Sequence, residues 1–180
     1  MTEIDGNTIA VEGFNNGLIP PSATEREWAL NYAKSNASNG WNRMLPGVAS
    51  AKVPAGDLSD EETILNFFFG PSLNINGIRS GFTGPGTLPF SLPSEASARI
   101  DLRIPRGMKA DLVVNQFRSH LDKQGYSDIE LRVMGAFDPS TTDPDTTLVK
   151  SIIRSFEEMD VPLSLSPGTG AGGPWSLYGS

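Results

Sequence analysis

The chain has 180 residues, of which 38% are hydrophobic and 19% are charged, and its formal net charge is −7; these values are typical of a folded globular protein and exclude a disordered chain or a membrane-embedded one. The lack of cysteine excludes a disulfide framework, a thiolate nucleophile and a zinc–thiolate site, and a single histidine, His120, argues against a multi-histidine metal centre. The acidic balance and the absence of a basic run argue against nucleic acid or an anionic membrane as a partner, and we expect a cytoplasmic protein because no leader follows Met1.

The N-terminal region predicts a short strand and a capped helix. Residues Thr8–Val11 predict a strand that ends before the Asn16–Gly17 pair, because this pair favours the positive φ of a tight turn. A helix is predicted over 23–34, since Ser22 can cap it and Glu25 stands at the reciprocal position of a capping box. Its apolar residues are few, so we expect it to pack on a surface.

The central region contains the clearest strand. Residues 35–56 lack a hydrophobic period and predict an irregular connection, after which Ser59–Phe69 predicts a short helix with acidic residues in its first turn. Leu73–Asn76 alternates as a strand. Residues 96–104 alternate strictly between apolar and polar side chains, which predicts a half-buried strand with one polar face.

A helix and a further strand extend this pattern. The apolar residues of Ala110–Lys123 recur at helical spacing, and Gly125 stands at the expected stop. Ile129–Met134 alternates as another strand. Strands and a helix joined by short links in this order predict an antiparallel sheet with helices on one face. The predicted fold class is therefore α+β, with a ferredoxin-like order of elements.

The C-terminal part of the chain follows a polar linker. Residues 138–146 contain three aspartates, Asp138, Asp143 and Asp145, which predict turns and caps because they lack the spacing of a calcium loop. A helix is predicted over 147–159, and residues 161–165 are compatible with a strand. A domain boundary is placed near residue 140.

Two features are candidates for anion binding, each with an ordinary structural alternative. The small residues 168–173 let backbone N–H groups approach an anion, but the Lys-Ser/Thr of a P-loop is missing, so a carboxylate-binding nest and a flexible turn are both open. Arg103 can hold a carboxylate in two bonds or form an ion pair on the sheet, and from the residues alone the ion pair is favoured. His120 has no evident partner for metal binding or a catalytic triad and predicts a helix-flank residue.

Three motifs occur in order and at regular spacing: Leu73–Ile78 (LNINGI), Gly81–Thr87 (GFTGPGT) and Pro93–Ile104 (PSEASARIDLRI). Upstream of them stand Val11–Phe14 (VEGF), Pro20–Pro21 and Glu25. This series resembles peptidase family M20, the co-catalytic zinc peptidases that include carnosinases, aminoacylases and carboxypeptidase G. The resemblance covers most of the chain and is weakest over residues 35–56.

The resemblance implies a lid and dimerisation domain over residues 1–140, lacking the lid's first strand and helix, and a partial return into an α/β catalytic domain over 141–180. It further implies a homodimer formed through the lid sheet, a peptide or N-acyl amino acid as substrate, and zinc in the parent enzyme. The family's zinc ligands and catalytic glutamate are not matched in this sequence. We therefore assign no catalytic residue, no metal ligand and no cofactor to this chain.

The resemblance also points to a substrate-binding site. Arg103 matches the lid arginine that clamps the substrate's carboxylate in similar enzymes, which favours the clamp over the ion pair. Gly170–Pro174 resembles a Gly-Gly-Ser-x-Pro loop lining the same pocket, so Gly170, Ala171, Gly172 and Gly173 are assigned to substrate binding. Ala171 and Gly172 stand where Gly and Ser are usual, so a hydroxyl contact is missing, and Pro105–Arg106 stands where Val-Pro is common.

The resulting hypothesis is the lid and dimerisation segment of a zinc-dependent metallopeptidase or amidohydrolase acting on dipeptides or N-acyl amino acids. Such a segment would contribute the substrate-carboxylate clamp and would be inactive alone. The alternative is a non-enzymatic, self-associating binding module that pairs through an exposed sheet edge. A third hypothesis is an incomplete polypeptide that folds poorly, because missing lid elements would leave apolar sheet surface uncovered.

Overall fold

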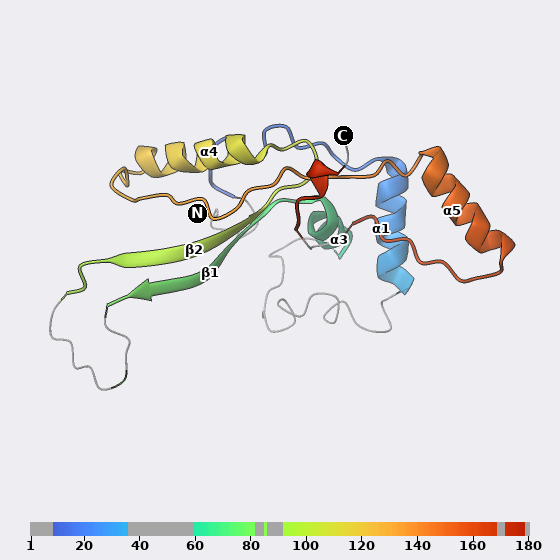
Figure 1. Ribbon diagram of the computed structural model, residues 1–180, viewed down its shortest axis with the longest axis horizontal. Coiled ribbons are helices and arrows are strands. Elements are labelled where there is room, and N and C mark those ends of the chain that lie inside the picture. Colours follow the sequence, from blue (N-terminus) through green and yellow to red (C-terminus); the bar gives the residue numbers. More distant parts are fainter. Residues whose placement is uncertain (1–8, 36–59, 82–84, 86–91, 169–171, 179–180) are drawn as a thin grey trace.

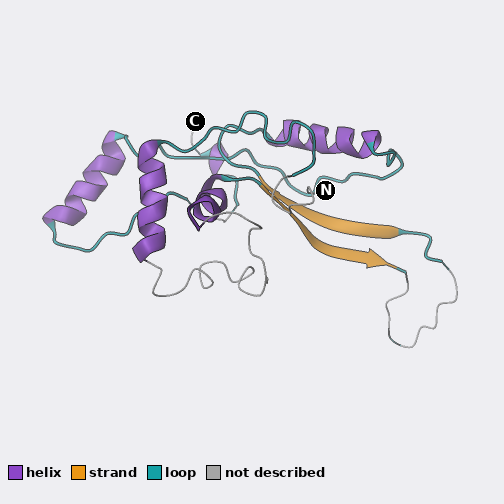
Figure 2. Ribbon diagram, turned by 180° about the vertical axis from the view of Figure 1, so that it is seen from behind, coloured by secondary structure: helices purple, strands orange, loops and turns teal. Residues whose placement is uncertain are grey.

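The computed structural model describes residues 9–35, 60–81, 85, 92–168 and 172–178 (Figure 1). The elements are, in chain order, helix α1 (Ala23–Ser35), helix α3 (Asp60–Phe69), strands β1 (Ser72–Ser80) and β2 (Ala96–Arg103), helices α4 (Ala110–Lys123) and α5 (Thr147–Glu158), and the short 3₁₀ helix η2 (Trp175–Leu177). Seen from behind, α4 and the β1–β2 hairpin lie at one end of the molecule, and α1 and α5 lie at the other (Figure 2). The predicted α+β class is confirmed.

The hairpin is an antiparallel pair with one irregularity. The pairing runs from Ser72 opposite Arg103 to Ser80 opposite Ala96, with a register shift between Ile75 and Gly77. The predicted strand over 96–104 is confirmed as β2, whereas β1 continues past its predicted end at Asn76. The bulge explains the difference, because an extra residue breaks the alternation of side chains while pairing resumes beyond it.

The two faces of the hairpin differ in polarity. Side chains of a strand alternate between faces, and one face packs on the apolar core through half-buried residues: Leu73, Ile100 and Leu102. The register places polar residues together on the other face: Ser72, Asn74, Asp101 and Arg103. The predicted polar face of β2 is therefore shared by β1.

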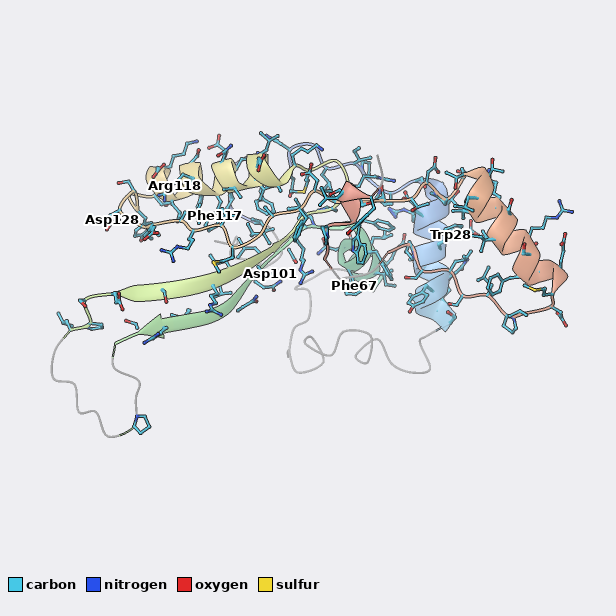
Figure 3. The ribbon with its side chains drawn as sticks, in the orientation of Figure 1. Trp28, Phe67, Asp101, Phe117, Arg118 and Asp128 are labelled. Carbon is cyan, nitrogen blue, oxygen red and sulfur yellow. The ribbon has the colours of Figure 1, made fainter. Side chains whose placement is uncertain are left out.

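Helix α4 packs against the apolar face. Its buried stripe consists of Val113, Phe117 and Leu121, spaced four residues apart along the helix. These side chains form one core with Val11, Phe14 and Met108. Phe117 lies between α4 and the hairpin (Figure 3). It is only 4% exposed, and burial of a side chain of this size contributes about 2–3 kcal/mol to stability.

A second apolar cluster joins α1 to α3. Its buried members are Ala29, Ala33 and Ile64. The ring of Phe68 packs edge-on against Tyr32 with centroids 6.0 Å apart. The two alanines explain how α1 packs closely despite having few large apolar residues, since small side chains let the helices approach.

The N-terminal segment meets the β2–α4 connection at two glycines. Gly17 and Gly107 have φ values of +85° and +89°, and a Cβ built on Gly107 would lie 2.0 Å from the carbonyl oxygen of Gly17. Ile19 N–H donates to the carbonyl of Arg106 at 3.0 Å. Both positions therefore require glycine, for the left-handed backbone and for the close contact.

The predicted strand over 129–134 is wrong, and the segment 161–165, which is compatible with a strand in sequence, does not form one either. Residues 129–134 and 161–165 form no ladder in the structure. Near the first segment, Arg118 on α4 donates to the carbonyls of Ile129 at 2.7 Å and Tyr126 at 2.9 Å. The Arg118 side chain thus occupies the backbone carbonyl of Ile129, which a partner strand would otherwise use. Leu131 still packs on the core. The other two alternating apolar residues, Ile129 and Val133, are 46% and 51% exposed. Alternation alone therefore does not make a strand here, because a ladder also needs a partner strand.

The aspartates of the linker form a cap and a turn, as predicted. Asp138 accepts a hydrogen bond at 3.0 Å from Ala110 N–H, in the first turn of α4, and its other oxygen lies 2.8 Å from Lys109 Nζ. The hydrogen bond from Lys109, followed by that from Ala110, lowers the pKa of Asp138. Asp143 accepts from the backbone N–H of Asp145 at 2.8 Å.

Helix α5 confirms the predicted helix over 147–159 to within one residue, but none of its residues is buried. Thr146 caps it by accepting from Val149 N–H. Two of its large apolar side chains are exposed, Leu148 at 68% and Ile152 at 47%, whereas Ile153 and Phe156 are half-buried. The predicted apolar stripe is therefore covered only in part.

Candidate carboxylate-binding site

Arg103 ends β2 on the polar face of the hairpin. Its register partner on β1 is Ser72, and its side chain is 47% exposed. The strict alternation of β2 puts the guanidinium on this face, because Leu102 beside it packs on the core. The arginine is therefore held at the base of the hairpin with its charge in contact with solvent.

Asp101 lies two residues before Arg103 and on the same face. Its Oδ2 accepts a hydrogen bond from Arg103 Nε at 2.6 Å. Opposite Asp101 stands Asn74, whose Nδ2 donates to Ser72 Oγ at 3.4 Å. The group is polar, with the aspartate on the Nε side of the guanidinium.

The C-terminal loop reaches the guanidinium at Gly172. A Cβ built on Gly172 would lie 3.1 Å from Arg103 Nη1, a contact that only a residue without a side chain makes comfortably. The fold thus brings together two of the predicted site residues that are 69 positions apart in sequence. Glycine at 172 has no side-chain hydroxyl to offer a ligand, and it lets the arginine approach the loop backbone.

The other predicted loop residues are placed only in part. A Cβ on Gly173 would lie 2.8 Å from Trp175 Nε1, so the indole of Trp175 lies next to this glycine. Gly170 and Ala171 lie outside the described residues. Gly168, at the start of the loop, lies near α3, 4.0 Å from Phe68 as measured from a built Cβ.

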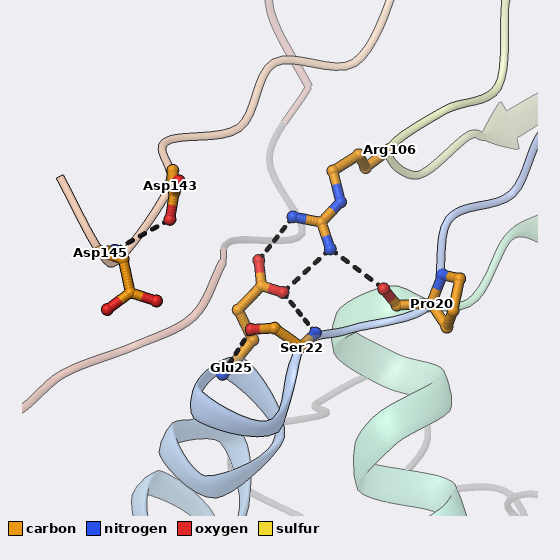
Figure 4. A network of polar contacts seen from close by, with 6 residues as sticks. All are labelled: Pro20, Ser22, Glu25, Arg106, Asp143 and Asp145. Carbon is orange, nitrogen blue, oxygen red and sulfur yellow. Dashed lines mark hydrogen bonds and ion pairs between the residues drawn. The ribbon is translucent and has the colours of Figure 1, made fainter.

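A second arginine, Arg106, was not singled out as a functional residue by sequence reasoning. Its two terminal nitrogens lie 2.8 and 2.9 Å from the two carboxylate oxygens of Glu25, and it also donates to the carbonyl of Pro20 at 3.1 Å (Figure 4). The capping box is confirmed, because Ser22 N–H donates to Glu25 at 2.7 Å and Glu25 N–H donates to Ser22 Oγ at 3.2 Å. This network fixes the connection that follows Arg103.

Electrostatics favour the ionised form of Glu25. The residue is buried, with 6% exposure, and burial alone raises its pKa. The hydrogen bonds from Ser22 and the ion pair with Arg106 outweigh burial, so the pKa of Glu25 lies below its ordinary value. The carboxylate therefore stays charged as a structural group joining α1 to the β2–α4 connection.

The described residues do not gather the donors of a zinc site: no three His, Cys, Asp or Glu side chains come together there. His120 is half-buried on α4 and lines a separate hollow of about 430 Å³ with Ala10, Leu121, Gln124, Tyr126 and Ile129. None of these residues belongs to the Arg103 group.

In the part of the chain with assigned structure, no helix has the length and apolar character needed to cross a membrane.

Comparisons with known structures show a common fold. An M20 family metallo-carboxypeptidase from Sulfolobus solfataricus matches with 22% identity and a TM-score of 0.75, covering 98% of this chain and 38% of that structure. Human carnosine dipeptidase 1 matches with 18% identity and a TM-score of 0.71, covering 98% of this chain and 37% of that one. The dipeptidase Dug1p of Saccharomyces cerevisiae matches with 16% identity and a TM-score of 0.66, at 98% and 36% coverage.

The chain spans less than two-fifths of the length of each of these structures. A search of curated proteins gave no match. The family model of the peptidase dimerisation domain, M20_dimer, matches residues 12–129, a range that contains α1, α3, the hairpin and α4. Because this match covers well over half of the sequence, the chain belongs to the peptidase dimerisation domain family of the M20 metallopeptidases.

Proposed function

We propose that this chain is the lid and dimerisation segment of a zinc-dependent hydrolase of dipeptides or N-acyl amino acids, and that Arg103 clamps the carboxylate of the substrate. Residues 1–140 would form the lid, and residues 141–180 would belong to the catalytic domain. The observation that carries the proposal is the approach of Arg103 Nη1 to Gly172, which joins the end of β2 to a loop rich in small residues.

The chemistry of this site suits a carboxylate. A guanidinium presents a planar fork of N–H donors that matches two carboxylate oxygens, and Arg103 is 47% exposed, so a ligand can reach it. The backbone beside Gly172 adds surface without bulk. In the parent enzyme, zinc would polarise the scissile carbonyl and activate water. The described residues offer no fitting set of ligands, so this chain alone would hold substrate and not cleave it.

Titration with N-acetylglycine tests the clamp. The full 180-residue chain is expected to bind N-acetylglycine, and Arg103→Ala is expected to weaken binding about tenfold or more, since a charge-assisted hydrogen-bonded contact is removed. Arg99→Ala is the matched control, because Arg99 is an exposed arginine on the same strand and the same face. Equal affinities of Arg103→Ala and the unchanged chain would contradict the clamp. If this chain by itself hydrolysed a dipeptide in the presence of zinc, the proposal that it is inactive alone would be wrong.

Self-association through the lid sheet is the second part of the proposal. Ile75 and Ile78 on β1 are 51% and 74% exposed, and exposed apolar residues on a strand are suited to pairing with another copy. Light scattering should show a dimer that Ile78→Lys dissociates. Leu148→Lys on α5, at a residue 68% exposed, is the control and should leave the dimer unchanged. A monomeric parent chain would contradict this part.

The non-enzymatic binding module remains the alternative. It shares the exposed β1 residues with the lid proposal but does not require Arg103 to bind carboxylates. A dimer that binds no N-acetylglycine, and whose properties do not change in Arg103→Ala, would favour it. A cooperative thermal unfolding transition is expected for both and would contradict a polypeptide that folds poorly.

A further inference from the structure

The guanidinium of Arg103 is contacted on two sides by different parts of the chain. Asp101 Oδ2 lies 2.6 Å from Nε, and Gly172 approaches Nη1. Asp101 and Arg103 are two residues apart on β2, a spacing that puts both side chains on one face of the strand. The contact between Asp101 and Arg103 therefore lies within one strand and does not depend on the position of the C-terminal loop.

We infer that Asp101 is the positioning residue of the carboxylate clamp, a role that rests on the proposed function of Arg103. A free arginine side chain has many rotamers, and ordering it on binding costs affinity. A hydrogen bond at Nε fixes the plane of the guanidinium, and in this orientation Nη1 lies against the C-terminal loop at Gly172. Asp101 itself need not touch the substrate.

The neighbours of Asp101 suit this role. Asp101 is 35% exposed, less than the 47% of Arg103, so the aspartate is the more sheltered member of the pair. Its register partner Asn74 is neutral, as is Ser72 opposite Arg103. Neither of these two neighbours on β1 adds a charge that competes with Asp101 for the guanidinium.

Charge alone would predict the opposite effect. An aspartate beside Arg103 also repels an incoming carboxylate, so if it acted mainly as a competing anion, its removal would tighten binding. If it acts by orienting Arg103, its removal weakens binding. The sign of the effect therefore separates the two roles.

The experiment compares Asp101→Ala and Asp101→Asn in the full chain. N-acetylglycine is the probe, and the Nε–Hε signal of Arg103, assigned by its loss in Arg103→Lys, is followed by ¹H–¹⁵N NMR. Asp101→Ala should weaken binding about two- to tenfold and speed exchange of the Nε–Hε proton. Asp101→Asn keeps an acceptor of the same shape, so it should restore most of the affinity and the slow exchange.

Glu130→Ala is the matched control. Glu130 accepts from Arg132 at 3.0 Å with the same two-residue spacing, and both side chains are about three-quarters exposed. It should change neither binding nor the Arg103 signal. The inference is overturned if Asp101→Ala binds N-acetylglycine as well as or better than the unchanged chain while Arg103→Ala loses binding, a result that leaves the clamp intact. If Arg103→Ala also binds normally, the proposed function itself fails.

Discussion

Arg106 and Glu25 form a two-bond ion pair, with distances of 2.8 and 2.9 Å, across 81 positions of sequence. Glu25 is also half of the capping box that begins α1. The same carboxylate therefore starts a helix and holds the connection that leaves β2. Because Arg103 stands only three residues before Arg106, this ion pair ties the base of the candidate clamp to α1.

Arg106→Ala is expected to destabilise the fold by about 2 kcal/mol. It leaves the sheltered Glu25 carboxylate, whose side chain is 7% exposed, without its cationic partner, and breaking such a pair is costly. Urea unfolding measures the loss. Arg154→Ala is the control, since its ion pair with Glu158 is exposed and should be worth less than about 0.5 kcal/mol. Equal losses in both variants would contradict the role of Arg106.

Acid should weaken the fold through two carboxylates. The pKa of Glu25 and that of Asp138 both lie below their ordinary values in the folded chain. Each group therefore contributes stability that is complete above its unfolded pKa and is lost as the pH falls through its folded pKa. Urea midpoints should fall as the pH drops below about 4.5, the ordinary pKa of glutamate.

Glu25→Gln isolates the glutamate's share of this pH dependence. The variant should be less stable near neutral pH, because it loses the charge that Arg106 binds, and its stability should fall less steeply in acid. Asp138→Asn should act in the same direction through the cap of α4. A slope for Glu25→Gln equal to that of the unchanged chain would show that Glu25 does not carry the effect.

Gly107→Ala should be among the most damaging substitutions in the described chain. An L residue at φ of +89° is strained by about 1–2 kcal/mol, and the new Cβ would also lie 2.0 Å from the oxygen of Gly17. Gly125→Ala is the matched control, because Gly125 has φ of +84° with nothing within 4 Å of a Cβ.

The difference between these two alanine variants measures the contact alone. We expect Gly125→Ala to lose about 1 kcal/mol and Gly107→Ala at least about 3 kcal/mol in urea unfolding. Similar losses would mean that the segment containing Gly17 moves aside readily. The approach of the two backbones would then contribute little to holding the N-terminal segment.

Local signals account for the parts of the fold that were predicted. The capping box of Ser22 and Glu25 and the apolar stripe of α4 lie within a few residues along the chain, and both predicted helices are confirmed. The strict alternation of β2 likewise predicts its polar face. In these elements, propensity, pattern and packing agree.

Long-range contacts account for what was not predicted. Nothing near Arg106 in sequence indicates Glu25, and nothing near Gly172 shows that Arg103 Nη1 would approach it. Only the resemblance to M20 peptidases predicted that Arg103 and the loop containing Gly172 belong to one site. The expected strand over 129–134 failed for a related reason, because Arg118 occupies the carbonyl of Ile129 and no pattern within the segment reveals that bond.

Gly172→Ala should weaken carboxylate binding without unfolding the chain. Its Cβ would lie 3.1 Å from Arg103 Nη1, so the guanidinium must shift by a few tenths of an ångström, and N-acetylglycine binding should fall about threefold. Urea unfolding should change by less than about 0.5 kcal/mol, because the site is at the surface. Gly168→Ala is the control, since its Cβ meets nothing closer than 4.0 Å and both binding and stability should be kept.

Unchanged binding in Gly172→Ala, with Arg103→Ala impaired, would mean that the arginine acts without the loop. Weaker binding in Gly172→Ala alone would place the ligand on the loop backbone instead.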